Sequence, residues 1–126
     1  MVLRVGIDLV HVADVEEALR RYGERYLMRV YTEQERRECG NDCRRLAGRF
    51  AAKEAAMKAL RRDDEPLAWQ SIAVHQDEHG LPTLRLTGTA AERARLGGVK
   101  SLSLSFSRAG GLAAAVVLAE LGDGDE

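Results

Sequence analysis

The sequence predicts an α+β domain in which an antiparallel sheet packs against one long helix. Alternating apolar residues at Val2–Val10 and a run of small apolar residues at Ala113–Glu120 predict strands near both ends of the chain. Residues 42–62 lie between them, are rich in Ala, Arg, Leu, Glu and Lys, and contain no proline, which gives them high helix propensity. This mixture of strands and helices indicates the α+β class.

The N-terminal strand is expected to be half-buried and to end near Asp8. Its alternating apolar residues are Leu3, Val5, Ile7 and Leu9. A helix follows, with Asp14 as the expected N-cap and Glu17 three residues later, as in a capping box. The apolar stripe of this helix consists of Val15, Leu19, Tyr22 and Tyr26. Gly23 is expected to break or kink it.

Residues typical of helix ends and of turns mark two further elements. Thr32–Glu35 has the form of a capping box and should begin a short helix that Gly40 ends. Apolar residues at 72–74 and 83–86 flank a polar segment around Gly80, which predicts a β-hairpin.

The last third of the chain should hold one more helix and two more strands. Thr89 is the expected start of the helix and Gly97 its end, and the two strands should meet at residues 108–111. The folded domain is expected to span residues 1–121 and to leave residues 122–126 as a disordered tail.

With 126 residues and 45% hydrophobic content, the chain suits one domain and is too short for two. Its formal net charge of −1 gives no reason to expect bulk attraction to nucleic acid or to a membrane. No apolar run approaches the ~20 residues that span a bilayer, and the N-terminus lacks a signal-peptide pattern. Cys39 and Cys43 do not form a Cys-x-x-Cys pair. We therefore expect a reduced, cytoplasmic protein.

Positive charge gathers on the predicted long helix, where acidic residues are few. The basic residues of this stretch are Arg44, Arg45, Arg49, Lys53, Lys58, Arg61 and Arg62. Two interpretations are open: the helix faces an anionic ligand, or its long side chains are solvated and cover apolar neighbours.

Glu54 and Lys58 lie one helical turn apart, so that a carboxylate and an ammonium could serve one phosphate and metal site. The same spacing is also the commonest stabilising pair on an exposed helix face. Asp8 supplies a second carboxylate at the end of the first strand, although an Asp in such a place is more often a cap or turn residue.

Together these segments resemble a known family. Gly-Ile-Asp at residues 6–8 and Arg-Phe-Ala-Ala-Lys-Glu-Ala at residues 49–55, followed by Lys58, are similar to motifs of the holo-acyl-carrier-protein synthase branch of the 4′-phosphopantetheinyl transferases. The resemblance continues through Trp69, the Gly-Leu-Pro turn at residues 80–82 and the closing small-residue strand. It covers nearly the whole chain.

The resemblance implies an enzyme that moves the phosphopantetheine arm of coenzyme A to a serine of an apo acyl carrier protein of fatty-acid or polyketide synthesis. Adenosine 3′,5′-bisphosphate is released. Asp8 and Glu54 are then Mg²⁺ ligands, and oxygen ligands are what Mg²⁺ prefers. Lys58 would contact the phosphate and assist proton transfer, with Glu54 or a water on the metal helping to deprotonate the serine.

Binding residues and partners are implied as well. Coenzyme A contacts are assigned to Arg49, Lys53, Lys58, Gly80, Pro82, Ser105 and Arg108. Docking of an acidic carrier protein is assigned to Arg20, Arg21, Arg25 and Arg29. The last three of these share one side of a helix if Gly23 does not break it. Family members are usually homotrimers with the coenzyme site between subunits, so a homotrimer is expected.

One position departs from the family pattern. Members usually carry Ser-x-Ser-His or Ser-x-Thr-His in the penultimate strand, where this chain reads Ser103-Leu104-Ser105-Phe106. A phenyl ring lacks the hydrogen bonds and charge of an imidazole, so a phosphate contact is lost or supplied elsewhere, with Arg108 as the substitute. Two alternatives to transfer stay open. One is a noncatalytic member that binds carrier protein or coenzyme A, and the other is an enzyme that acts on a carrier-bound substrate.

Overall fold

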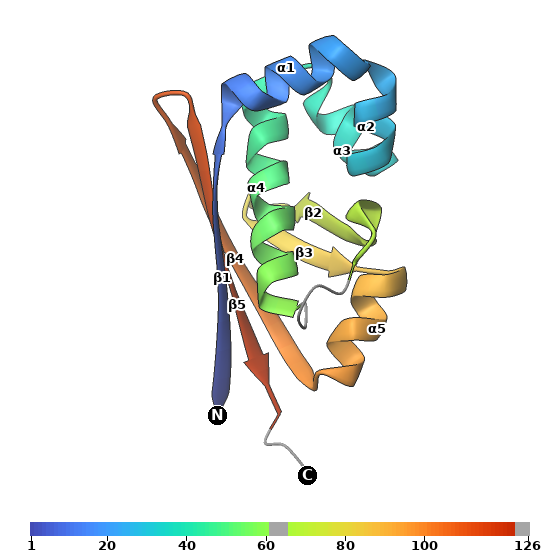
Figure 1. The fold of residues 1–126 in the computed structure, drawn as a ribbon. Coiled ribbons are helices and arrows are strands. Elements are labelled where there is room, and N and C mark those ends of the chain that lie inside the picture. The colour runs from blue at the N-terminus through green and yellow to red at the C-terminus, as the bar shows by residue number, and fades with distance from the viewer. Residues whose placement is uncertain (61–65, 123–126) are drawn as a thin grey trace.

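The computed structural model describes residues 1–60 and 66–122 of the chain. Its elements, in order, are β1 (Val2–His11), α1 (Val12–Tyr22), α2 (Glu24–Val30), α3 (Glu33–Cys39), α4 (Cys43–Leu60), the 3₁₀ turn η1 (Trp69–Ser71), β2 (Ile72–Gln76), β3 (Pro82–Leu86), α5 (Gly88–Leu96), β4 (Val99–Ala109) and β5 (Leu112–Leu121). A three-stranded sheet of order β1-β5-β4 forms one side of the molecule, and α4 and the other elements lie together against one of its faces (Figure 1). The predicted α+β class is confirmed.

The register of this antiparallel sheet places residues of all three strands in one row. Asp8 of β1 is opposite Ala115 of β5, and Ala115 is opposite Phe106 of β4. Opposed side chains point to the same face of a sheet, so Asp8 and Phe106 point toward α4, as the buried Ala115 does. Two strand spacings of about 4.8 Å separate β1 from β4. Asp8 and Phe106 therefore lie on the two flanks of the helix that covers β5.

Small residues let α4 lie close to the sheet. The β5 residues that face the helix are Ala113, Ala115, Val117 and Ala119, all of them buried. On β1, Gly6 has no room for a side chain, because a Cβ there would lie 1.9 Å from the Ala55 carbonyl oxygen. Gly6 therefore sets the distance between β1, which carries Asp8, and α4, which carries Glu54.

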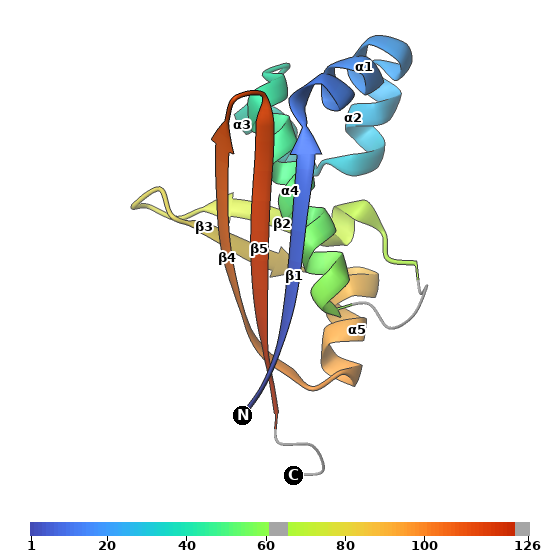
Figure 2. The same ribbon diagram turned by 60° about the vertical axis from the view of Figure 1, so that its left-hand side comes forward.

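The apolar row of β1 lies on the uncovered face of the sheet, so the expectation that it forms the buried side of the strand is wrong. This row is Leu3, Val5, Ile7 and Leu9. Ile7 is 66% exposed, and Val116 of β5 is opposite it on the same face. The reason is steric: α4 needs the glycine side of the strand, so the larger apolar side chains face outward. Figure 2 shows that the other face of the sheet is not covered by any of the described helices.

Helix boundaries in the first third follow the predicted signals with one exception. Gly23, with a φ of 57°, ends α1 and separates it from α2. The capping box of α3 is confirmed, because the Thr32 hydroxyl accepts from the Glu35 nitrogen while the Glu35 carboxylate accepts from the Thr32 nitrogen. The N-cap prediction for Asp14 is wrong. The expected end of the first strand near Asp8 is also wrong, because β1 continues to His11. Helix α1 therefore begins at Val12, and Asp14 lies in its first turn.

The later elements also match, with a shifted start for one helix. The β2–β3 hairpin and the β4–β5 pair are confirmed. Helix α5 begins at Gly88 after the N-cap Thr87, so Thr89 does not begin it. The predicted end of the long helix at residues 61–62 and residues 123–126 of the predicted tail lie outside the described residues. Among the helices described, none is long and apolar enough to cross a membrane.

Two tyrosines near the start of α4 resist ionisation. The Tyr31 hydroxyl donates to the Leu46 carbonyl oxygen at 3.1 Å and lies 2.8 Å from the Tyr26 hydroxyl. Burial raises the pKa of both phenols above the ordinary value of 10.0. A raised pKa in the folded state stabilises the fold below the unfolded pKa, and this contribution is lost as the pH rises.

We therefore expect the free energy of unfolding to fall as the pH rises above ~10. The slope of this fall should be smaller in Tyr31→Phe than in the wild type, by roughly 1.4 kcal/mol per pH unit. Burial lowers the pKa of Lys53, which acts in the opposite sense, but Lys53 is present in both proteins and cancels in the comparison. Urea unfolding from about pH 8 to pH 11 measures both slopes. Equal slopes would contradict the assignment to Tyr31.

Candidate active site

Asp8 and Lys58 join β1 to α4 through an ion pair of 3.0 Å between Oδ1 and Nζ. Lys58 Nζ also donates to the Ile7 carbonyl oxygen at 3.0 Å, which holds the ammonium beside the strand. The side chains of Asp8 and Lys58 are 16% and 46% exposed. A ligand in solvent can therefore reach both charges.

Glu54 lines the same cleft as Asp8. This hollow of about 360 Å³, here called the acidic cleft, is lined among others by Asp8, Asp14, Tyr26, Phe50 and Glu54. Phe50, Glu54 and Lys58 follow one another at a spacing of four, so they share one face of α4. Because β1 lies against that helix, the two predicted metal ligands are brought to one place.

A second hollow, of about 580 Å³, opens beside β4, on the other flank of α4. We call it the basic cleft, and its lining includes Arg44, Arg45, Gly80, Pro82, Phe106 and Arg108. Guanidinium groups present planar sets of donors that match phosphate. Asp42 also lines the cleft, but its carboxylate accepts from the backbone nitrogens of Arg44 and Arg45, at 3.0 and 3.3 Å. Three arginines thus line one hollow, and one of them, Arg45, also donates from Nη1 to the Glu38 carbonyl oxygen at 2.9 Å.

Phe106 and Arg108 reach the basic cleft from the same face of β4, because residues two apart in a strand point the same way. The Phe106 ring rests on α4 at Gly48, where a Cβ would lie 3.0 Å from the ring. The Arg108 side chain passes the same glycine at 3.7 Å from that Cβ position. Gly48 therefore makes room for both side chains.

Four of the predicted coenzyme contacts lie outside the basic cleft, and one of them is Lys58, which pairs with Asp8 of β1. Ser105 points to the uncovered face of the sheet, because it alternates with Phe106 along β4. Arg49 is buried, and its Nη2 donates to Glu38 Oε1 at 3.1 Å. Lys53 is completely buried. Since Arg49 and Lys53 are buried and line neither the acidic nor the basic cleft, charge on the helix was a poor guide to which side chains reach solvent.

The structure adds residues that sequence reasoning did not assign to a site: Arg44, Arg45 and Gln76 at the basic cleft, and Tyr26 and Phe50 at the acidic cleft. Arg44 and Arg45 were considered only as part of the basic stretch, and Gln76 only as the start of the polar segment that leads to Gly80. The sequence gives little indication that Arg44, Arg45 and Gln76 share a site, because the β2–β3 hairpin meets the start of α4 only in the folded chain.

A third hollow, here called the aromatic groove, adjoins the acidic cleft and shares Ala18, Tyr26 and Phe50 with it. Its lining includes Tyr22, Arg25, Tyr26, Arg29, Phe50 and Trp69. The Phe50 and Trp69 rings stack, with centroids 5.0 Å apart and planes at 24°.

The four arginines expected to dock a carrier protein are divided between two helices. Arg20 and Arg21 lie in the last turn of α1, where Arg20 pairs with Glu17 and Arg21 lies over the Tyr22 ring. Arg25 and Arg29 belong to α2 and line the aromatic groove. Because Gly23 ends α1, the four do not form a row along one helix.

The fold and the clefts indicate a protein that handles a phosphorylated ligand between acidic and basic groups. The family model of the 4′-phosphopantetheinyl transferase superfamily matches residues 4–117. The chain belongs to this superfamily, which confirms the resemblance inferred from its motifs.

Two similar proteins carry the name holo-acyl-carrier-protein synthase. The protein from Herpetosiphon aurantiacus is 40% identical, over 92% of this chain and 97% of its own length. The protein from Chloroflexus aurantiacus is 42% identical, over 93% of this chain and 97% of its own length.

Solved structures agree with this membership. The Helicobacter pylori synthase in complex with coenzyme A has a TM-score of 0.82 and 31% identity, and the match covers 92% of this chain and 99% of that one. The Chronobacterium ammoniagenes complex with coenzyme A has a TM-score of 0.84 and 32% identity, covering 97% and 99%.

Proposed function

We propose that this chain transfers 4′-phosphopantetheine from coenzyme A to a serine of an apo acyl carrier protein and releases adenosine 3′,5′-bisphosphate. The observation that carries this proposal is the meeting of Asp8, Glu54 and Lys58 around the acidic cleft, in a fold shared with holo-acyl-carrier-protein synthases. The serine oxygen forms a bond to the phosphorus of the pantetheine phosphate. The phosphoanhydride bond to the nucleotide breaks, and the serine proton leaves.

Asp8 and Glu54 suit Mg²⁺, which takes oxygen ligands and is commonly held by one or two carboxylates together with water and substrate phosphates. Among the described residues there is no group of three or more His, Cys, Asp or Glu side chains that could hold a metal. A two-carboxylate site that relies on the phosphates of the substrate fits that finding. When bound, Mg²⁺ would neutralise the pyrophosphate and stabilise the charge on the leaving nucleotide.

The side chains themselves supply the remaining steps. Lys58 exchanges its bond to Asp8 for one to a phosphoryl oxygen, because its side chain is half exposed and its ammonium pairs with Asp8, which lines the cleft. Glu54 accepts the serine proton, since its carboxylate lines the cleft that the hydroxyl must enter. The apolar Phe50 and Tyr26 limit water around the reacting groups.

The test is intact-protein mass spectrometry of an apo acyl carrier protein incubated with this chain, coenzyme A and Mg²⁺. We expect a phosphopantetheine adduct on the carrier serine that EDTA abolishes. If several carriers gain no adduct while coenzyme A or carrier binding persists, the chain is a noncatalytic binder. A change in an acyl group already on the carrier would instead indicate a redirected enzyme.

The basic cleft is the proposed site for the nucleotide end of coenzyme A, with Arg108, Arg44, Arg45, Gly80 and Pro82 as its contacts. Arg108 supplies the positive charge beside Phe106. We expect Arg108→Ala to weaken coenzyme A binding by roughly 10- to 100-fold, the value of a hydrogen bond to a charged group. Isothermal titration calorimetry measures this change. Arg95→Ala, on α5, removes an exposed arginine outside the cleft and should leave the affinity unchanged.

The aromatic groove is the proposed docking site for the carrier protein. It adjoins the acidic cleft, so a carrier bound there can deliver its serine to Glu54. Arg25 and Arg29 on its lining complement the acidic surface of a carrier, which mainly accelerates encounter and weakens with salt. In the adduct assay, the rate at limiting carrier concentration should therefore fall as the salt concentration rises.

A homotrimer is proposed from the uncovered apolar face of the sheet. Val5 is 60% exposed and Ile7 66%, and a contiguous apolar face of this kind marks an interface. The acidic and basic clefts flank α4 on different sides, so contact between subunits could bring the acidic cleft of one to the basic cleft of its neighbour. The predicted cytoplasmic location stays a prediction.

Val5→Asp should prevent assembly, because it places a charge in the proposed interface. Size-exclusion chromatography with light scattering should give the mass of three chains for the wild type and of one chain for the variant. Leu96→Asp is the matched control, since Leu96 is 59% exposed on α5, away from the sheet face. A wild type that elutes as a monomer would contradict the trimer.

A further inference from the structure

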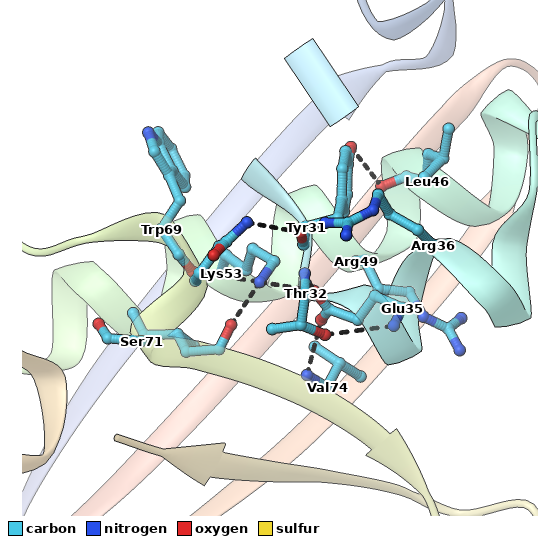
Figure 3. A network of polar contacts seen from close by, with 12 residues as sticks. Tyr31, Thr32, Glu35, Arg36, Leu46, Arg49, Lys53, Trp69, Ser71 and Val74 are labelled. Atoms are coloured by element: carbon cyan, nitrogen blue, oxygen red, sulfur yellow. Dashed lines mark hydrogen bonds and ion pairs between the residues drawn. The ribbon is translucent and has the colours of Figure 1, made fainter. Parts of the chain in front are cut away.

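Lys53 and Glu35 form an ion pair in the interior that lines none of the three hollows. Their side chains are 0% and 1% exposed, and Nζ lies 2.8 Å from Oε1. The ammonium has two further acceptors, the Trp69 carbonyl oxygen at 3.2 Å and the Ile72 carbonyl oxygen (Figure 3). The three N–H donors of Lys53 are thus matched by three acceptors.

The carboxylate of Glu35 is equally occupied. Oε1 also accepts from the Thr32 nitrogen, and Oε2 accepts from the Val74 nitrogen, each at 2.8 Å. The pair therefore ties α4 to the start of α3, to η1 and to β2 (Figure 3).

Stability alone is a weak reason for such a pair, because apolar side chains of similar volume often stabilise a core as well or better. Apolar side chains cannot hold particular carbonyl groups by directed hydrogen bonds, whereas an ammonium can. The distinctive contribution of Lys53 is therefore the position of η1.

That position matters because η1 carries Trp69, whose ring stacks on Phe50. Phe50 lies one turn before Glu54 and lines both the aromatic groove and the acidic cleft. Gln70 of η1 adds a second bond, from its amide nitrogen to the Met28 carbonyl oxygen of α2. A displaced η1 would move the wall of the groove and the helix that carries its arginines.

We propose that Lys53 is a positioning residue for the carrier-protein substrate: its bonds to the Trp69 and Ile72 carbonyl groups fix the Phe50–Trp69 wall beside Glu54. This inference rests on the proposed function. Lys53 needs no contact with either substrate. The nucleotide end of coenzyme A is proposed to bind in the basic cleft, on the other flank of α4, so coenzyme A binding should depend on η1 much less than carrier binding does.

The experiment uses the double variant Glu35→Gln, Lys53→Met, which removes both charges together and leaves neither uncompensated. The matched control is Glu92→Gln, Arg95→Met, which removes an exposed ion pair on α5. Trp69 is the only tryptophan of the chain, so acrylamide quenching of its fluorescence reports on η1 alone. The KM values for apo carrier protein and for coenzyme A, and the melting temperature, complete the comparison.

We expect acrylamide to quench Trp69 more readily in the double variant, and the KM for the carrier to rise roughly tenfold because the docking wall is misplaced. The KM for coenzyme A should rise far less. Unchanged quenching, or a parallel rise of both KM values, would overturn the proposal. If the double variant does not fold, Glu35→Gln with Lys53→Gln decides, because it keeps hydrogen-bonding side chains in the core and removes the ammonium that reaches both carbonyl groups. Unchanged quenching in that variant also overturns the proposal. If the wild type shows no transfer activity, the proposed function is wrong. The quenching comparison does not depend on that activity and still tests whether Lys53 fixes the position of η1.

Discussion

Asp8→Asn and Glu54→Gln should each lower kcat for carrier modification by roughly 10³-fold while leaving the fold intact. Each change keeps the size of the side chain and removes the charge that the acidic cleft offers to a metal. The loss should appear mainly in kcat, because the nucleotide end of coenzyme A is expected to bind in the basic cleft. For Asp8→Asn, the Lys58 ammonium also loses the carboxylate that holds it at 3.0 Å.

Rates of adduct formation across a series of Mg²⁺ concentrations measure the effect. Glu16→Gln is the matched control, since it removes an exposed carboxylate of α1 that lines none of the hollows, and its kcat should equal that of the wild type. Circular dichroism of each variant establishes that the fold is retained. Wild-type turnover in either Asp8→Asn or Glu54→Gln would show that the metal and base roles belong to other groups.

Among substitutions that add one methyl group to this protein, Gly6→Ala should cause the largest loss of stability and activity. Its Cβ would lie 1.9 Å from the Ala55 carbonyl oxygen, which is a backbone atom of α4 and cannot rotate away. Either β1 or α4 must shift, and forcing extra volume into a packed core costs about 1–3 kcal/mol or more. The same shift separates Asp8 from Glu54, so activity should fall further than the loss of stability explains.

Urea unfolding gives the stability change, and kcat at a temperature where the variant is fully folded gives the effect on the site. Gly122→Ala is the matched control. Its Cβ would lie 3.6 Å from the Gly98 carbonyl oxygen, an ordinary contact, so its stability should change by less than about 0.5 kcal/mol. A Gly6→Ala variant as stable and active as the control would contradict the account of how β1 and α4 are spaced.

Local signals in the sequence were sufficient for most of the elements. The proline-free, alanine-rich stretch became α4, Gly23 separated two helices, and the Thr32 capping box began α3. These are short-range effects of propensity, capping and glycine, which act through neighbouring residues. Motif spacing also identified the family, and it predicted that Asp8 and Glu54 lie together; the structure places both on the lining of one cleft.

Side-chain direction was decided only by tertiary contacts. Alternation in β1 shows which residues share a face, but not which face α4 covers, and the tight approach at Gly6 turned the apolar row outward. Positive charge on the predicted helix likewise did not show which lysine is buried. Lys53 is buried with Glu35, whereas Lys58 reaches solvent beside Asp8. Partners distant in sequence make that choice, because burial of a charge is tolerated only where opposite charge and hydrogen-bond acceptors meet it.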